Sequence, residues 1–331
     1  MNRKLLTISV AAYQVEAFIE QALRSVCVAD AVDQLEIFVV DDGGTDGTLN
    51  IAKKYAERYP DSVFPVHKEN GGYGSVINYS LAHATGTFFK LLDGDDWFDS
   101  EGLVKLLDIL EKTDADIVMT NYKSGPDPEH LTVRDYYAEE GGGIKDLSRF
   151  TAQSDFGMWA MTFRTQTLRD CAFILPEHVL YTDALMVSYS LSKAKTMQYY
   201  DFSVYCYRLC RDGQSMSRES IMKHYPEMID NDLRLAAYCA EQETNLNYPI
   251  IRKRVSEYHA GTIHFMLLMP ICRSSLREIK ELDQKVRALS RDVYRFSENA
   301  GHTGLLLRIM RRTAYLPYWG MVFFQKMLKF S

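Results

Sequence analysis

The stretch Lys90-Leu91-Leu92-Asp93-Gly94-Asp95-Asp96-Trp97 decides the fold class of this chain. Apolar residues lead directly into a tight group of carboxylates around a glycine, a pattern typical of a strand that ends at a sheet edge. Carboxylates at such an edge can hold a hard divalent cation through oxygen ligands, and that cation can neutralise a diphosphate. A solvated acidic loop is the alternative for this cluster taken alone.

Two glycine-rich turns precede the acidic cluster and strengthen the first interpretation. Residues 35–48 run from a β-branched and aromatic strand into acids, a glycine-rich turn and a helix pattern. Residues 67–78 hold a second glycine-rich turn before a helix, and residues 5–10 form an N-terminal strand. Repeated strand–turn–helix units build a parallel sheet whose ligands bind beyond the carboxyl ends of its strands. Three sets of polar residues are therefore predicted to converge on one edge.

Taken together, these pieces resemble the inverting family 2 glycosyltransferases with the GT-A fold. The motifs that carry the resemblance, in the family's order and spacing, are Ser9-Val10-Ala11-Ala12-Tyr13, Val39-Val40-Asp41-Asp42-Gly43-Gly44-Thr45-Asp46-Gly47-Thr48, Glu69-Asn70-Gly71-Gly72-Tyr73-Gly74 and Asp93-Gly94-Asp95-Asp96. The resemblance is strong over residues 1–120 and looser over residues 150–217. It implies an α/β fold with a mixed, mainly parallel sheet, followed by a C-terminal helical region.

The length of 331 residues is enough for a nucleotide-binding domain and additional structure. The resemblance implies a catalytic domain over residues 1–220, with a nucleotide-sugar-binding half at 1–122 and an acceptor-binding half at 123–220. From residue 221 onward the apolar spacing is helical, which predicts a C-terminal helical region over 221–331. Pro226 is the first expected break in that region.

Composition and charge exclude several classes of protein. A net charge of −6 gives no indication of a nucleic-acid partner. The six cysteines are scattered without a zinc-site spacing, which favours reduced thiols in the cytosol. The N-terminus lacks a signal-peptide pattern, and no run approaches the ~20 apolar residues of a membrane-spanning helix. We therefore expect a cytoplasmic protein.

The resemblance implies how a nucleotide-sugar donor is held. Ala12 and Tyr13 lie where the family cradles uracil, and Asp42 would accept a hydrogen bond from the pyrimidine imide. The alternative for this carboxylate is to cap the next helix or to bond the turn. Asn70-Gly71-Gly72 resembles the family's second donor-contacting segment, and a tight turn is the alternative for its glycines.

The Asp-X-Asp motif of the family falls on Asp93 and Asp95. Asp93 would face the ribose or the metal, and Asp95 would bind the metal and the diphosphate. Mn²⁺ or Mg²⁺ suits these oxygen ligands, and the metal would stabilise the departing diphosphate as a Lewis acid. Asp96 would cap the next segment or join the site.

The family also places an acidic general base at the start of a later helix. The segment Pro176-Glu177-His178-Val179-Leu180-Tyr181-Thr182-Asp183 matches this arrangement, with Asp183 as the base and a helix N-cap as its alternative role. Thr182 stands where many relatives have Glu, a departure that bears on the class of acceptor. Arg211, or Arg208 in the same segment, would pair with the diphosphate, and a solvated basic turn is the alternative. Residues 157–164 are predicted to form a strand. Trp97 and Trp159 would form an apolar platform for a sugar face or belong to the core, and the core is the favoured interpretation for Trp159.

Residues 301–331 combine five basic side chains and many large apolar ones with no acid. This composition suits a helix that lies in an anionic membrane surface, at the inner face of the membrane. A terminal helix packed on the protein, or on a second copy of the chain in a homo-oligomer, is the alternative.

The predicted function is metal-dependent, inverting transfer of a sugar, with UDP as the expected nucleotide, to a glycan or lipid-linked acceptor in surface polysaccharide synthesis. A nucleotidyltransferase is one alternative, although it would usually show a basic glycine-rich loop near the N-terminus, and Ala11-Ala12-Tyr13 lacks that character. A non-catalytic protein that binds nucleotide-sugars or glycans on the same fold is the other alternative.

Overall fold

The computed structural model describes residues 4–134, 143–149, 157–209, 214, 217–267, 273–316, 318 and 320. The chain divides into two compact units, Met1–Asp212 and Gly213–Ser331. The boundary expected from the sequence, between residues 220 and 221, lies a few residues later.

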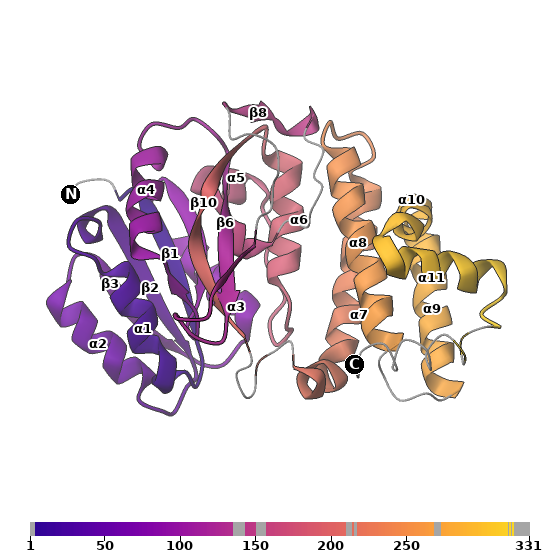
Figure 1. Ribbon diagram of the computed structural model, residues 1–331, viewed down its shortest axis with the longest axis horizontal. Helices are drawn as coiled ribbons and strands as arrows, with labels where there is room; N and C mark the ends of the chain where they lie inside the picture. The colour runs from indigo at the N-terminus through magenta and orange to yellow at the C-terminus, as the bar shows by residue number, and fades with distance from the viewer. Residues whose placement is uncertain are drawn as a thin grey trace. The chain divides into compact units, whose positions relative to one another are not determined.

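The first unit is built on one mixed sheet (Figure 1). Within the described ranges its strands are β1 Leu6–Ala12, β2 Leu35–Asp42, β3 Val63–Lys68, β4 Phe88–Asp93, β5 Trp97–Phe98, β6 Ile117–Gly125, β7 Thr132–Arg134, β8 Lys145–Asp146, β9 Met161–Arg164 and β10 Thr196–Arg208. Their order across the sheet is β3-β2-β1-β4-β9-β6-β10-β5, with β7 on β6 and β8 on β10. The long pairings β3–β2–β1–β4 and β6–β10 are parallel, whereas β5, β7, β8 and β9 run antiparallel to their neighbours. This topology confirms the predicted mixed, mainly parallel sheet.

Apolar sequence runs explain why β1, β2 and β4 lie in the middle of the nucleotide half. All eight residues of β2 are buried, and β1 and β4 are buried except near their carboxyl ends. Strands covered on both faces read as continuous apolar runs, whereas a half-exposed strand alternates. The carboxylates of Asp41, Asp42 and Asp93 lie where these strands end, at the edge that the sequence predicts for the site.

Six helices accompany the strands in the described part of this unit. They are α1 Glu16–Val26, α2 Thr48–Arg58, α3 Tyr73–His83, α4 Ser100–Leu110, α5 Thr165–Asp170 and α6 Asp183–Lys193, with 3₁₀ turns η1 Val32–Gln34, η2 Leu147–Arg149 and η3 Met158–Ala160. The helix α4 is capped by Asp99, whose side chain accepts a hydrogen bond from the Gly102 backbone N at 2.9 Å. This bond satisfies one of the free backbone N–H groups at the start of the helix.

The segment 157–164 differs from its predicted form. We expected one strand there, but only Met161–Arg164 is strand (β9), and the 3₁₀ turn η3 precedes it. The carbonyl of Trp159 accepts a hydrogen bond from the buried Lys90 Nζ at 3.0 Å, so it does not continue the ladder. Trp159 is partly exposed and does not belong to the buried core that the sequence predicted for it.

The second unit is helical over its described residues, as predicted, and is drawn from orange to yellow in Figure 1. Its elements are α7 Arg218–Glu241, α8 Tyr248–Leu267, α9 Arg273–Leu289, α10 Arg291–Phe296, η4 Ser297–Asn299 and α11 Gly301–Arg312. Pro226 does not break the first helix, because α7 runs through it. A proline inside a helix removes one backbone hydrogen bond, and we attribute the continuity of α7 to its packing against α8 and α9.

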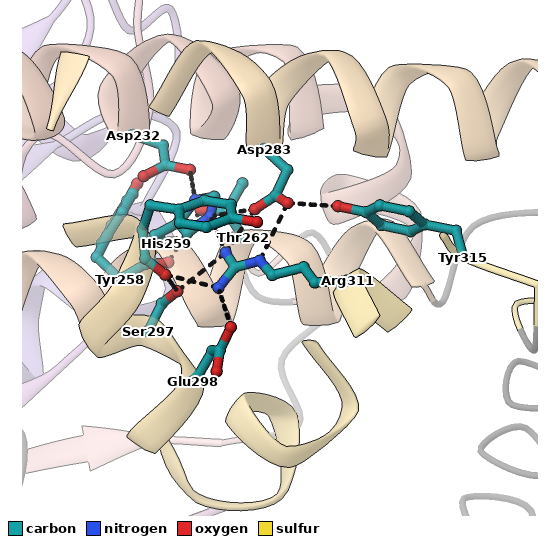
Figure 2. Close-up of polar contacts among 10 residues, drawn as sticks. Asp232, Tyr258, His259, Thr262, Asp283, Ser297, Glu298, Arg311 and Tyr315 are labelled. Carbon is teal, nitrogen blue, oxygen red and sulfur yellow. Dashed lines mark hydrogen bonds and ion pairs between the residues drawn. The ribbon is translucent and has the colours of Figure 1, made fainter. Parts of the chain in front are cut away.

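A buried network of charges joins helices of this unit (Figure 2). Nδ1 of His259 in α8 lies 2.7 Å from Asp232 Oδ2 in α7, and its Nε2 lies 3.2 Å from Asp283 Oδ1 in α9. Arg311 in α11 donates to both oxygens of Asp283, at 3.1 and 2.5 Å, and Tyr315 also donates to this carboxylate. Although burial favours the neutral imidazole, the two carboxylates raise the pKa of His259 to about 9. The ring is therefore a buried imidazolium between two carboxylates.

We expect His259→Ala to destabilise the protein strongly at neutral pH. Breaking a buried ion pair typically costs about 3–5 kcal/mol, because the other charge is left buried and unpaired. A histidine whose pKa is raised on folding contributes stability that is complete below its unfolded pKa, near 6.5, and is lost as pH rises through about 9. The difference in unfolding free energy between variant and wild type should therefore shrink across that range, as measured by calorimetry at several pH values.

Arg234→Ala on α7 is the matched control for this prediction. It removes an exposed ion pair with Asp230, in which both side chains are 48% exposed. Such a pair contributes only about 0.3–0.5 kcal/mol. A His259→Ala effect that stays constant between neutral pH and about pH 10 would contradict the charged imidazole.

Candidate active site

The acidic cluster at the end of β4 divides into exposed and buried carboxylates. Asp93 and Asp95 are partly exposed, whereas Asp96 is buried. Asp96 accepts hydrogen bonds from the Tyr205 hydroxyl and the Arg208 backbone N, both at 2.7 Å, and so joins the cluster to β10. Burial and then the charges of Asp93 and Asp95 raise the pKa of Asp96 well above its ordinary range. The outward-facing carboxylates are thus the two predicted for the Asp-X-Asp motif.

Arg208 supports this cluster from inside the protein. Its Nε donates to the Asp95 carbonyl at 2.8 Å, its Nη2 donates to Gln21 Oε1 at 2.6 Å, and its guanidinium lies 4.7 Å from the centre of the Trp97 ring. These contacts position the backbone of Asp95, a role that the sequence analysis did not assign to Arg208. Arg211, the predicted diphosphate contact, lies outside the described residues.

The carboxylate of Asp42, at the end of β2, holds the second glycine turn. It accepts hydrogen bonds from the backbone nitrogens of Gly71 at 2.9 Å and Gly72 at 2.7 Å, and from Lys68 Nζ at 2.8 Å. The Asn70 side chain donates to the Asp42 carbonyl at 2.8 Å, and Gly72 has φ of +79°, where glycine is favoured. These contacts match the alternative in which Asp42 bonds the turn. A contact between Asp42 and the pyrimidine base of the nucleotide stays a prediction.

The first strand brings a third set of residues to the same edge. Ala12 ends β1 and is buried, whereas Tyr13 follows it with 54% of its surface exposed. β1 lies between β2 and β4, and its register pairs Ala12 with Asp41 and Ala11 with Asp93. The exposed Tyr13 ring is therefore next to the strand ends that carry the acidic residues.

Asp183, the predicted base, lies near the acidic cluster. Burial and then the charges of Asp93 and Asp183 raise the pKa of Tyr73 well above its ordinary value, so both carboxylates lie near one phenol. The Tyr73 hydroxyl donates to Asp93 Oδ1 at 2.7 Å. Asp183 is the first residue of α6, and the N-cap position is taken by Thr182, which makes no side-chain cap bond. The Asp183 carboxylate therefore lies at the start of α6, but Asp183 does not occupy the N-cap position.

Helix α3 positions the segment that leads to Asp183. The side chain of Asn78 bonds both backbone groups of Leu175, donating to its carbonyl and accepting from its N–H at 2.9 Å each. The Gly71 carbonyl accepts from the His178 backbone N at 2.6 Å. The second glycine turn and the base segment are therefore directly bonded to each other, a connection that the sequence analysis missed.

Two residues of this segment have left-handed backbone conformations without being glycine. His178 has φ of +56° and Tyr181 has φ of +61°. Such conformations cost on the order of 1 kcal/mol each and persist only where surrounding contacts enforce them. In the same segment the Gly71 carbonyl holds the backbone N of His178, and the Asn78 side chain holds Leu175.

No group of three or more His, Cys, Asp or Glu side chains in the described ranges is arranged to hold a metal ion unaided. The carboxylates of Asp93 and Asp95 would therefore hold a cation only together with ligands from a substrate or water.

Comparison with known proteins identifies the family. The model of "Glycosyl transferase family 2" matches residues 7–169. The uncharacterized glycosyltransferase MG060 homolog of Mycoplasma pneumoniae is 30% identical over 228 residues, which cover 68% of this chain and 75% of that protein. The chain belongs to glycosyl transferase family 2. It is a glycosyltransferase, as the sequence predicts, and the nucleotidyltransferase alternative is no longer favoured.

Solved structures share the fold at low identity. S. aureus TarS 1–349 in complex with UDP-GlcNAc has a TM-score of 0.72 at 20% identity, over 96% of this chain and 90% of that one. The mannosyltransferase PcManGT from Pyrobaculum calidifontis in complex with GDP-Man and Mn²⁺ has a TM-score of 0.51 at 15% identity, over 100% and 82% of the chains. The family's GT-A fold, expected from the sequence, is confirmed.

We expect Gly74→Ala to displace the segment that precedes Asp183. A Cβ at Gly74 would lie 2.4 Å from the Pro176 carbonyl oxygen, which forces one of the two backbones to move. A misplacement of about 1 Å can cost on the order of 10²-fold in rate, and overpacking typically costs about 1–3 kcal/mol of stability. Hydrolysis of a nucleotide-sugar, together with thermal unfolding, measures both effects.

Gly261→Ala in α8 is the matched control, because a Cβ there meets nothing within 4 Å. It should leave hydrolysis unchanged and stabilise the helix by up to about 1 kcal/mol. Wild-type hydrolysis by the Gly74→Ala protein would show that the position of the base segment does not limit the reaction.

Proposed function

We propose that this glycosyltransferase moves a sugar with inversion from a UDP-sugar to a hydroxyl group of a glycan or lipid-linked acceptor. The observation that carries the proposal is that Asp93, from the Asp-X-Asp motif, and Asp183 both lie near Tyr73. Asp93 and Asp95 are partly exposed at the end of β4, and Asp183 lies at the start of α6. Inverting transfer requires one set of groups for the diphosphate and a separate base for the acceptor. The UDP-GlcNAc bound to TarS supports UDP as the nucleotide.

Asp93 and Asp95 fit a divalent cation, for which we propose Mn²⁺ or Mg²⁺. Both are oxygen ligands, and both are held in place, Asp93 by the Tyr73 hydroxyl and the Asp95 backbone by Arg208. The Mn²⁺ bound to PcManGT supports this choice. When bound, the cation would stabilise the negative charge of the departing diphosphate.

Asp183 would act on the other substrate. Its carboxylate would take the proton from the acceptor hydroxyl while that oxygen forms a bond to the anomeric carbon and the bond from that carbon to the diphosphate breaks. Because attack comes from the face opposite the leaving group, the configuration inverts. The hydrogen bonds between Asn78 and Leu175, and the one that the His178 backbone N donates to the Gly71 carbonyl, would keep the base in place.

The place of action in the cell is also part of this proposal. We propose that the enzyme works at the inner face of a membrane in surface polysaccharide synthesis, with contact through residues 301–331. No described helix is long and apolar enough to cross a membrane. In α11, Leu305 and Ile309 are exposed apolar residues, and Arg312 is an exposed cation. Arg311, however, is turned inward to Asp283, so this segment has less free positive charge than its sequence indicates.

We expect Asp95→Ala to abolish metal-dependent binding of UDP-sugars. The variant loses a predicted metal ligand but keeps the backbone carbonyl that Arg208 contacts. Calorimetry with UDP-GlcNAc, with and without Mn²⁺, measures the effect. Asp108→Asn on the exposed face of α4 is the control for loss of one negative charge. An Asp95→Ala protein whose donor affinity still rises with Mn²⁺ would sink the metal assignment.

Asp183→Asn should keep donor affinity and lose turnover. Removal of a general base typically lowers the rate by about 10²–10⁴-fold. Hydrolysis of a UDP-sugar measures the rate, and calorimetry with UDP measures the binding. Hydrolysis at the wild-type rate would assign the base to another residue, and Glu177 would be the next candidate.

A further inference from the structure

Three aromatic side chains from separate elements stack beside the acidic cluster. The ring of Trp159 in η3 lies 5.4 Å from that of Tyr122 in β6, with 23° between their planes. It lies 5.0 Å from the ring of Tyr207 in β10, with 34° between planes. All three are partly exposed. We call Tyr122, Trp159 and Tyr207 the aromatic platform.

Tyr207 adjoins the site, because the next residue, Arg208, donates its backbone N–H to Asp96 Oδ1 at 2.7 Å. The charges around the Tyr207 phenol agree with this position. Burial and then the charges of Asp96, Asp93, Asp95 and Asp183 raise its pKa. This phenol is therefore close to the predicted metal ligands and to the predicted base. One ring of the platform thus lies beside both groups of carboxylates.

Sheet topology puts the platform away from the donor turns. Tyr13 follows β1 and Asp42 ends β2, and both strands lie on one side of β4, in the order β2-β1-β4. The elements β9, β6 and β10 lie on the other side of β4, and they carry or adjoin the platform. A donor seated over the first set would therefore leave the platform for the second substrate.

Lys90 anchors the segment that carries the indole. It is fully buried in β4 and donates hydrogen bonds to the carbonyls of Trp159 at 3.0 Å and Met161 at 3.1 Å. The enclosed indole N–H of Trp159 has no hydrogen-bond partner within the described chain. The indole is therefore positioned through its backbone and through ring stacking. A fixed, partly exposed aromatic surface beside a catalytic centre is suited to binding a ligand.

We propose that the aromatic platform binds the acceptor by stacking against the sugar ring whose hydroxyl faces Asp183. This inference rests on the proposed function and adds a residue-level acceptor subsite to it. A pyranose has a face of C–H groups that packs on an aromatic ring, and its hydroxyls project from the edge, where a carboxylate can reach one of them. Large rigid aromatic side chains offer such contact area at little entropic cost.

The test uses the full chain, UDP-GlcNAc and other UDP-sugars as donors, and a panel of p-nitrophenyl glycosides as acceptor probes. Trp159→Ala should lower kcat/KM for the glycoside that wild type uses by about tenfold or more, mainly through KM, because one aromatic contact of this kind contributes about that factor. UDP-sugar hydrolysis and UDP affinity should stay within about twofold of wild type. Trp159→Phe retains a ring and should retain most of the acceptor affinity.

Two further variants keep the test decisive. Tyr122→Leu removes one ring of the platform and should change acceptor kinetics in the same direction, even if Trp159→Ala fails to fold. Tyr200→Ala is the matched control. This tyrosine also lies on β10, but its ring packs near Phe202, with 6.3 Å between the ring centres, and it is not part of the aromatic platform. Its acceptor kinetics should equal those of wild type.

Unchanged glycoside kinetics in Trp159→Ala and Tyr122→Leu would overturn the platform. A parallel loss of UDP affinity would overturn it too, because it would assign these rings to the donor site or to folding. If wild type hydrolyses UDP-sugars but uses no glycoside, the glycan acceptor of the proposed function is wrong, and this inference falls with it. If the wild-type protein does not bind UDP-sugars, the donor assigned in the proposed function is wrong.

Discussion

The carboxylate of Asp42 is the contact on which the geometry of the site depends. Asp42 is the last residue of β2, and its carboxylate accepts hydrogen bonds from the backbone N–H groups of Gly71 and Gly72. The second glycine turn is therefore fixed to the sheet. The same turn then accepts a hydrogen bond from His178, in the segment that leads to Asp183. Loss of these donors would leave a buried carboxylate without hydrogen bonds, which would lower the stability of the fold. The contact therefore couples the rigid sheet, the donor side and the predicted base.

Burial assigns different tasks to acidic residues that look alike in the sequence. Asp42 and Asp96 are both buried, and each is surrounded by donors from a distant part of the chain. Asp93 and Asp95 remain partly exposed in the same cluster. A buried carboxylate is satisfied by the protein, whereas an exposed one is available to a cation. Asp96 thus joins the acidic cluster to β10, and Asp42 holds the second glycine turn.

The sequence predicts the sheet edge well because the relevant signals are local. Apolar runs mark the buried strands, and the carboxyl ends of parallel strands meet at one edge. The bonds between Asn78 and Leu175 join residues 97 positions apart, and no local pattern marks such a pair. The strand predicted over 157–164 failed for a similar reason, because Lys90, far away in the chain, takes the carbonyl of Trp159. Tertiary contacts decided the cases that local propensity could not.

The second unit shows that composition alone overstates the free charge of a surface. The basic residues of 301–331 suggest a membrane-binding face, yet Arg311 is buried and neutralised by Asp283, which also contacts the buried ring of His259. A guanidinium with several buried acceptors is a structural element, because removing it from water requires compensating charge. The Arg308 side chain also bonds to the Glu298 carbonyl. Only the basic side chains that face solvent therefore count as evidence for an anionic partner.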